Sequence, residues 1–332
     1  MEKKSNRNLY YDVIRVIAMF LVIGVHAVGS IEQNAGNDLQ RAFVSFLERI
    51  NNLGVPTFFA LSGVLILSRE YKDIWGFYKN RLIRIGIPYC VYATLYVCYF
   101  TGYEEKNVLG IPLAFVRDIL TANVHPTHWF VYSIIGIYFA SPFLSRMFHS
   151  TNDSELKILL GGCLILSAIC NVFDLFQLSF GVKDILFNSG NLFMFIGGYS
   201  FNRLEKSDKA GILRHNLLLS AAFLVLYLVT DRSFLGQLAI MLTMIDSGIC
   251  DTYHPDNALH RMITAISKHS YSVYLIHAAV ISMLLMICKN WNEYFIIKCI
   301  LIYFVVFIVS YSLVRIIDFL ITDRLIEITI CF

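Results

Sequence analysis

Charged residues are scarce in this chain of 332 residues. Only 15% are Asp, Glu, Lys or Arg, against about a quarter in soluble domains, while 57% are hydrophobic. The mean hydropathy is +0.62, and a formal net charge of +3 is too small to indicate a charged partner. This composition excludes a water-soluble globule, a disordered chain, collagen and a nucleic-acid-binding protein. It indicates a membrane protein.

The cysteines lack the spacing of a metal site or a disulfide framework. No C-x-x-C pair occurs, and most of the eight stand inside apolar runs, where cysteine behaves as a small hydrophobic residue. We therefore expect no disulfides and no metal. Internal repeats, low-complexity tracts and linkers are also missing, so residues 1–332 are expected to form one transmembrane domain. The cysteines are Cys90, Cys98, Cys163, Cys170, Cys250, Cys288, Cys299 and Cys331.

Long apolar runs are what the sequence does contain. A helix that crosses the bilayer needs about 20 mostly apolar residues. Ten runs approach that length, which predicts an all-α, polytopic protein with about ten transmembrane helices. The runs cover 10–29, 43–67, 87–101, 129–148, 156–173, 185–201, 216–230, 233–250, 271–288 and 294–321.

The basic residues between the runs predict the orientation of the chain. They concentrate in the N-terminus and in the second and sixth connectors, whereas the first, third and fifth connectors are acidic or balanced. Because basic connectors stay on the cytoplasmic side, both termini are expected to be cytoplasmic. The basic residues are Lys3, Lys4, Arg7, Arg69, Lys72, Lys79, Arg81, Arg84, Arg203, Lys206, Lys209 and Arg214.

The first run carries three ionisable residues, which are costly inside a membrane and mark candidate sites. Asp12 and Arg15 are three residues apart and share a helix face. His26 follows Arg15 by eleven residues, which returns it to nearly the same face about 16 Å further along the axis. This stripe suits the wall of a channel or cleft. The alternative is an Asp12–Arg15 ion pair at the membrane surface, with His26 lying inert at the far interface.

Five stretches occur in the order typical of one family. The first helix contains YDVIRVIA at 11–18 and then His26, an Arg and His separated by ten residues. Together these stretches resemble acyltransferase family 3, the integral-membrane O-acyltransferases of bacterial surface polysaccharides, from about residue 8 to 290. In one departure from the family pattern, Asn80 stands where an Arg is common. The other four stretches are VPTFFALSGVLI at 55–66, FYKNRLIRI at 77–85, HWFVY at 128–132 and SYSVYLIH at 270–277.

The resemblance implies transfer of an acyl group, usually acetyl, from cytoplasmic acyl-CoA to a sugar hydroxyl. Acetyl-CoA would be the co-substrate, and membrane lipid and a glycan acceptor the partners. Neither nucleic acid nor a metal is expected, and the location would be the bacterial cytoplasmic (inner) membrane. The rival hypothesis is a transporter or flippase, since ionisable groups within the membrane also describe a substrate pathway.

The residues themselves allow a chemical account of such a transfer. His26 is the candidate catalytic residue, either as the general base for the hydroxyl or as a covalent acyl carrier, with Arg15 beside it. Lys79, Arg81 and Arg84 would bind the phosphates of CoA, because cations and planar guanidinium groups suit phosphate oxygens. Their alternative role is to anchor the chain to anionic lipid.

Six further residues are candidates for the substrate cavity, each with a structural alternative. A Ser-Gly pair in a membrane helix is commonly a close-packing motif. Aromatic residues near the bilayer surface commonly anchor a helix at that interface. His277 could be a histidine satisfied inside the protein, and either His125 or His128 could correspond to the histidine of the family. The six candidates are Asp12, Ser62, His128, Trp129, Tyr274 and His277.

Overall fold

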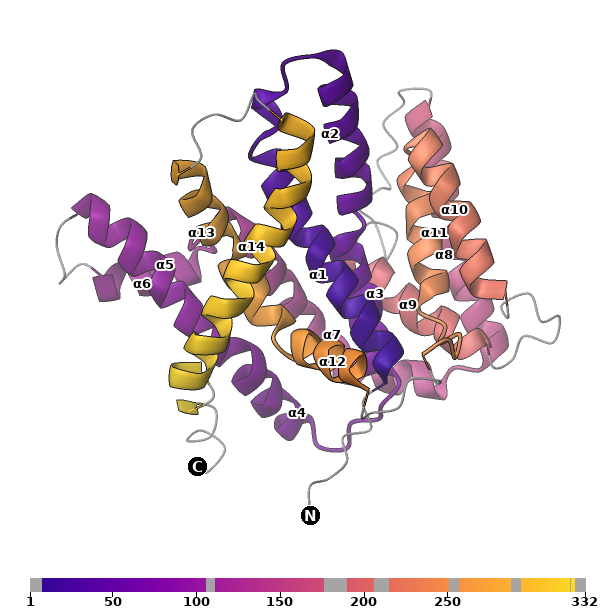
Figure 1. The fold of residues 1–332 in the computed structure, drawn as a ribbon. Coiled ribbons are helices and arrows are strands. Elements are labelled where there is room, and N and C mark those ends of the chain that lie inside the picture. Colours follow the sequence, from indigo (N-terminus) through magenta and orange to yellow (C-terminus); the bar gives the residue numbers. More distant parts are fainter. Residues whose placement is uncertain are drawn as a thin grey trace. The chain divides into compact units, whose positions relative to one another are not determined.

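The structure is a computed structural model that describes residues 8–105, 111–175, 190–205, 215–250, 257–287, 294–322 and 324–325. Within these ranges every regular element is helical, which confirms the all-α prediction (Figure 1). The cysteines whose side chains are described are free. Some basic residues and cysteines named above lie outside the described residues: Lys3, Lys4, Arg7, Lys206, Lys209, Arg214, Cys288 and Cys331. For Cys170 the structure describes the helix but not the side chain.

Six helical stretches among the described residues are long and apolar enough to cross a membrane. The chain is therefore a multi-pass membrane protein, while the count of about ten spans stays a prediction. Two shorter apolar helices follow one another, α10 (Asn216–Thr230) and α11 (Ser233–Thr243). The six stretches are Leu9–Gly29, Asp38–Leu67, Ile74–Tyr99, Pro126–Ser150, Ser270–Ile287 and Phe295–Ile321.

The chain divides into two compact units. Unit 1 comprises Met1–Val22, Ser45–Tyr71 and Ser141–Lys268, and unit 2 comprises Ile23–Val44, Lys72–Ala140 and His269–Phe332. Three helices contribute to both units: α1 (Leu9–Gly29), α2 (Asp38–Asn51) and α7 (Trp129–Ser150). Unit 1 also holds α3 (Gly54–Leu67), α8 (Asp153–Leu175), α9 (Asn191–Glu205), α10, α11 and α12 (Ala258–Lys268). Unit 2 also holds α4 (Ile74–Arg81), α5 (Ile87–Glu105), α6 (Ile111–Leu120), α13 (Ser270–Ile287) and α14 (Phe295–Ile317).

Glycines allow α3 and α9 to pack against each other at backbone distance in unit 1. A Cβ atom added at Gly63 would lie 1.7 Å from the carbonyl oxygen of Phe195, and one added at Gly198 would lie 2.4 Å from that of Ala60. Membrane helices associate through such small residues, because lipid supplies no hydrophobic force to drive them together. Gly63 belongs to the Ser-Gly pair of the sequence, so this part of the motif serves packing.

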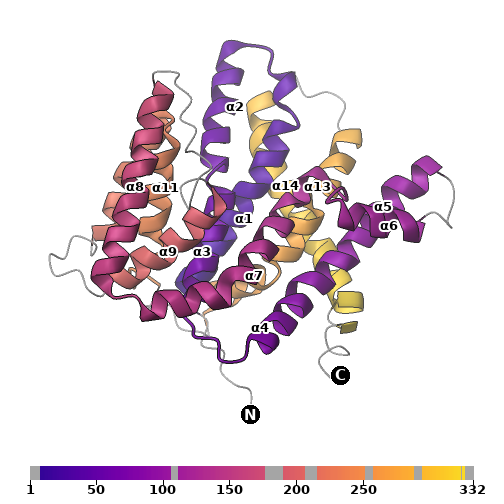
Figure 2. The same ribbon diagram turned by 180° about the vertical axis from the view of Figure 1, so that it is seen from behind.

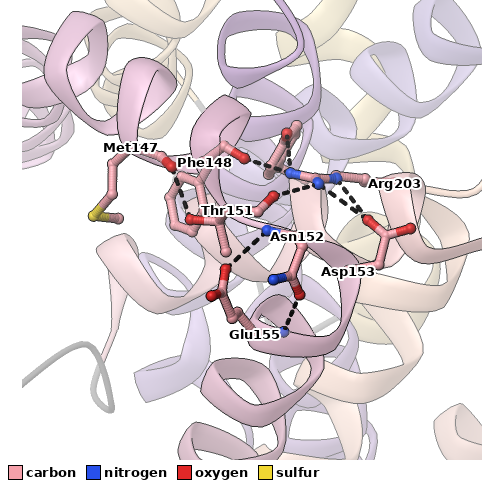
Figure 3. Close-up of polar contacts among 8 residues, drawn as sticks. Met147, Phe148, Thr151, Asn152, Asp153, Glu155 and Arg203 are labelled. Atoms are coloured by element: carbon pink, nitrogen blue, oxygen red, sulfur yellow. Dashed lines mark hydrogen bonds and ion pairs between the residues drawn. The ribbon is translucent and has the colours of Figure 1, made fainter.

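Arg203, near the end of α9, forms hydrogen bonds with the turn between α7 and α8. Its guanidinium group donates to Asp153 at 3.0 Å and to the carbonyl oxygens of Phe148 and Thr151 (Figure 3). We had assigned Arg203 to a connector; it lies within α9 instead, because the helix continues to Glu205.

The same turn starts α8 with reciprocal backbone capping. Asn152 accepts from the backbone N–H of Glu155, and the Glu155 side chain accepts from the backbone N–H of Asn152, both at 2.9 Å. Figure 3 shows this capping box directly beside the Arg203 contacts. The turn between α7 and α8 is therefore fixed from both sides.

We expect Arg203→Ala to lower the free energy of unfolding by roughly 1.5 to 3 kcal/mol, because hydrogen bonds from a charged group would be lost and two carbonyls left unpaired. A thermal-shift assay in detergent measures this change. The control is Arg41→Ala, since Arg41 pairs with Asp38 at an exposed site worth at most about 1 kcal/mol. Equal melting temperatures for the two variants would contradict the structural role of Arg203.

A buried polar cluster joins three elements of unit 2. Asp318 opens the π-helical turn Asp318–Thr322 at the end of α14. Its carboxylate accepts from Tyr92 of α5 at 3.1 Å and from Ser272 of α13 at 3.2 Å, and it pairs with His269 at 3.0 Å. A carboxylate left bare in this interior would be costly, so these partners hold the three elements in one register.

The basic segment that we had expected to be a connector is helical. Lys79 and Arg81 lie in α4, and Arg84 lies in the π-helical turn Leu82–Gly86 that leads into α5 (Figure 2). Asp73 begins α4 by accepting from the backbone N–H of Gly76 at 2.9 Å. The polar residues Lys79, Asn80, Arg81 and Arg84 interrupt the segment, so a search for apolar runs does not find its helices.

Candidate active site

Histidine and tyrosine rings form a cluster inside unit 2, which we call the histidine cluster: His26, Tyr96, His125, His128, Tyr274 and His277. The rings of His26, at the end of α1, and His277, in α13, are 5.1 Å apart between centroids. The ring of His128 lies 4.8 Å from that of Tyr96 and 5.7 Å from that of His125. Four of the six residues had been named as catalytic or cavity candidates, so the structure brings these four together.

A short turn directs His128 into this cluster. His125 precedes a 3-10 turn, Pro126–His128, and its Nδ1 accepts from the backbone N–H of Thr127 at 3.3 Å. His128 follows with no exposed surface, and its Nε2 donates to the carbonyl oxygen of Leu275 at 3.1 Å. Burial lowers the pKa of His125, which keeps its imidazole neutral at pH 7. The cluster therefore contains a neutral ring at its edge.

Helix α13 is tied to its neighbours by hydrogen bonds before and after His277 in the chain. The Tyr274 hydroxyl donates to the carbonyl oxygen of Thr127, and the Tyr96 hydroxyl accepts from the backbone N–H of Ala279 at 2.9 Å. His277 is fully buried, and its Nδ1 lies within hydrogen-bond distance of the carbonyl oxygen of Tyr274. These contacts give the rings of the cluster a fixed frame.

Asp12 and Arg15 lie in unit 1 and form an ion pair. Such a pair was part of the alternative to a catalytic stripe on the first helix. Arg15 donates to Asp12 and to the hydroxyl of Ser267, both at 3.0 Å. The Ser267 hydroxyl also donates to Asp12, at 2.6 Å. Asp12 is buried, so the pair compensates its charge and links α1 with α12. A catalytic role for Arg15 stays a prediction.

A groove of about 790 Å³ lies along α4, the π-helical turn and α7 in unit 2. Lys79 and Arg81 both line it. The guanidinium carbon of Arg81 lies 5.1 Å from the ring centroid of Phe77 and 4.9 Å from that of Tyr138, which holds the cation between two aromatic faces. Exposed Arg84 is not among the lining residues. The three basic candidates are thus separated: two face the groove and the third does not.

Besides Asp12, two more of the six cavity candidates are not part of the histidine cluster. Ser62 lies in α3 and therefore in unit 1. Trp129 is 46% exposed at the start of α7, and its ring packs edge to face on that of Phe130. An exposed tryptophan at a helix end fits an anchor at the membrane surface. Tyr96 was missed by the sequence analysis, because a tyrosine inside an apolar run carries no pattern that separates it from packing residues.

The sequence matches one protein family over nearly its whole length. The family model described as an acyltransferase domain, that of acyltransferase family 3, matches residues 8–315, including residues of both units. No match was found among curated proteins or among solved structures. Within the described residues, no group of three or more His, Cys, Asp or Glu side chains is placed to hold a metal ion. The family match covers nearly the whole chain, so this protein is a membrane acyltransferase and belongs to acyltransferase family 3.

Proposed function

We propose that this protein is an O-acetyltransferase that moves an acetyl group from cytoplasmic acetyl-CoA to a hydroxyl of a cell-surface polysaccharide or of its lipid-linked precursor. The observation that carries the proposal is the position of His26 in the histidine cluster, where its ring lies against that of His277. The family match supports acyl transfer, and the cluster supplies the group that such a transfer needs.

The reaction needs a proton acceptor at the hydroxyl. In direct transfer, neutral His26 takes the hydroxyl proton while the oxygen attacks the thioester carbonyl, a C–O bond forms and the C–S bond breaks. The proton then passes from His26 to the departing sulfur, which leaves as the thiol of CoA. In the covalent route, a ring nitrogen of His26 attacks the thioester carbonyl, the C–S bond breaks and CoA leaves as the thiolate. The hydroxyl oxygen then attacks the acyl-imidazole, the C–N bond breaks, and the hydroxyl proton ends on the CoA sulfur. Both routes require the neutral imidazole.

The basic groove is our proposed site for the donor. CoA carries a pyrophosphate and a ribose phosphate, and Arg81 offers a guanidinium plane while Lys79 offers a compact cation. Gly86, the last residue of the π-helical turn, also lines the groove, and Tyr96 of the cluster follows it by ten residues, or about 15 Å of helix axis. The extended pantetheine arm of CoA suits such a distance, with its phosphates in the groove and its thioester at the cluster.

The remaining parts of the proposal follow from the sequence. We place residues 1–332 in one acyltransferase domain in the bacterial cytoplasmic membrane, with both termini cytoplasmic. The basic residues Lys79 and Arg81 then face the compartment that supplies acetyl-CoA. Arg84 does not line the groove, and we propose that it binds a phosphate of CoA that lies outside it.

Membranes supplied with acetyl-CoA radiolabelled in the acetyl group test the function. Label that appears in surface glycan, together with release of CoA thiol, supports the transferase. Movement of a glycan or solute across the membrane without incorporation of label supports the transporter instead, and would overturn the proposal.

We expect Arg81→Ala to raise the KM for acetyl-CoA by roughly one to two orders of magnitude with a smaller change in kcat, because a charge-assisted contact of about 1.5 to 3 kcal/mol is lost. Arg81→Lys should recover only part of the affinity, since lysine cannot lie as a plane between Phe77 and Tyr138. Thiol release at varied acetyl-CoA measures both constants. Arg41→Ala is the control, and an unchanged KM in Arg81→Ala would return Arg81 to lipid anchoring.

A further inference from the structure

One ring nitrogen of His277 has its role fixed by its neighbour. A carbonyl oxygen can only accept a hydrogen bond, so Nδ1, which bonds to the carbonyl of Tyr274, must carry the proton. In the neutral imidazole Nε2 then bears a lone pair. This Nε2 is buried and has no hydrogen-bond partner, in a side chain with no exposed surface. A buried acceptor left unsatisfied costs free energy, so it indicates a partner that arrives during function.

His26 is the ring that His277 faces from the neighbouring helix, at 5.1 Å between centroids and tilted by 40°. A general base commonly has a partner that fixes its tautomer, and Asp12 cannot serve, because fourteen residues place it about 21 Å away along α1. Hydrogen bonds between catalytic groups are often long in the absence of substrate and shorten in the reacting complex. With the ring centroids 5.1 Å apart, this hydrogen bond forms when the His26 side chain turns a ring N–H towards Nε2 of His277.

We infer that His277 is the positioning residue of this acyltransferase: its Nε2 accepts a hydrogen bond from one ring nitrogen of His26 and thereby presents the lone pair of the other to the acceptor hydroxyl. The inference rests on the proposed function of His26 and deepens it. When His26 takes the hydroxyl proton, the same hydrogen bond becomes charge-assisted and stabilises the cation. His277 keeps its own proton on Nδ1 throughout, so one proton moves and no further co-reactant is needed.

A neutral imidazole suits this position better than a carboxylate. An ionised carboxylate within the membrane would carry a desolvation penalty of several kcal/mol unless it were paired. The rings in contact with His277 are those of His26 and Tyr274, and the other rings of the histidine cluster are likewise imidazoles and phenols and not carboxylates. His277 thus orients His26 without adding charge to the cluster.

The frame of α13 holds the acceptor lone pair in place. Its backbone bonds to His128 of the 3-10 turn through Leu275 and to Tyr96 of α5 through Ala279, before and after His277 in the chain. A side chain that is fully buried and anchored through Nδ1 loses little further freedom when it binds His26. This is the arrangement that a positioning residue requires.

Two variants of His277 separate hydrogen bonding from packing. His277→Phe keeps an aromatic ring of similar size without an acceptor, and should lower kcat at least about tenfold while the KM for acetyl-CoA and the melting temperature stay near wild type. His277→Gln places a carbonyl oxygen near the position of Nε2 and should recover most of the lost kcat. A wild-type kcat in His277→Phe, or a rise only in the KM of the glycan acceptor, would overturn the inference and make His277 a packing or substrate-contact residue.

A second measurement reads the hydrogen bond without any turnover. Solid-state NMR of the full chain in bilayers, labelled with ¹⁵N-histidine, should show His277 protonated at Nδ1 and coupled through Nε2 to His26, with the signals assigned by His26→Gln and His277→Gln. A proton on Nε2 of His277, or no coupling, contradicts the inference. If the coupling is present but wild-type membranes transfer no acetyl group, the proposed function fails and the histidine pair stands. If acetyl transfer occurs and the kcat of His277→Phe equals that of wild type, the proposed function stands and the role of His277 as positioning residue fails.

Discussion

His26→Ala is expected to lower acetyl transfer at least about a hundredfold, the usual effect of removing a general acid or base. The remaining rings of the cluster are held by other contacts: His128 bonds to Leu275 and His277 to Tyr274. The variant should therefore insert into the membrane, melt near the wild-type temperature and still bind acetyl-CoA in the groove. Incorporation of acetyl label into glycan gives the rate, and donor binding is measured separately.

A matched control for this substitution is His215→Ala. His215 is exposed, it precedes α10, and its side chain caps no backbone group, so its removal should leave transfer unchanged. A correctly inserted His26→Ala protein that acetylates glycan at nearly the wild-type rate would remove His26 from the chemistry. The catalytic group would then be sought among His125, His128 and His277.

Apolar run length predicted most of the helices that the structure describes. The first run, 10–29, becomes α1 (Leu9–Gly29), and the ninth, 271–288, becomes α13 (Ser270–Ile287). These helices are visible in the sequence because the lipid requires one continuous apolar segment, and each backbone N–H and C=O must bond within it. Their ends agree within one residue for the same reason: polar residues stop the run where the bilayer stops.

Elements that do not depend on lipid contact could not be predicted in this way. The eighth run, 233–250, continues beyond α11, which ends at Thr243, and Asp246 of that run therefore lies outside the helix. Asp246 instead accepts from the backbone N–H of Gly248 and from the side chain of Asn8. Apolar composition says nothing about such a turn, because the stop is set by local hydrogen bonds.

The sequence predicted individual residues of the candidate site but not which of them contact each other in the fold. The Arg15 and His26 stripe identified His26, and the stretch at 270–277 supplied Tyr274 and His277 as cavity candidates. That His26 meets His277, 251 positions later, depends on how α1 and α13 pack within unit 2. The ring that lies against His26 is an imidazole, that of His277. Pairing across helices leaves no periodicity in a single sequence.

Gly63→Ala is expected to have the largest effect on stability. The added Cβ would lie 1.7 Å from the carbonyl oxygen of Phe195 and 2.6 Å from its carbonyl carbon, and both obstacles are backbone atoms that no rotamer change can move. Helices α3 and α9 would have to separate along the face on which Gly198 also packs. Overpacking usually costs about 1 to 3 kcal/mol, and a clash between backbones should reach or exceed the upper end. The melting temperature in detergent and the yield of folded protein in the membrane measure this loss.

The control is Gly162→Ala in α8, where a Cβ would have nothing within 4 Å. That substitution should be neutral, or stabilising by up to about 1 kcal/mol, because alanine has the higher helix propensity. Both variants add the same methyl group to the middle of a helix, so propensity cancels and only the contact with α9 distinguishes them. A Gly63→Ala protein as stable as Gly162→Ala would mean that α3 and α9 do not approach at backbone distance. The Ser62–Gly63 pair would then have to be explained by the substrate cavity and not by packing.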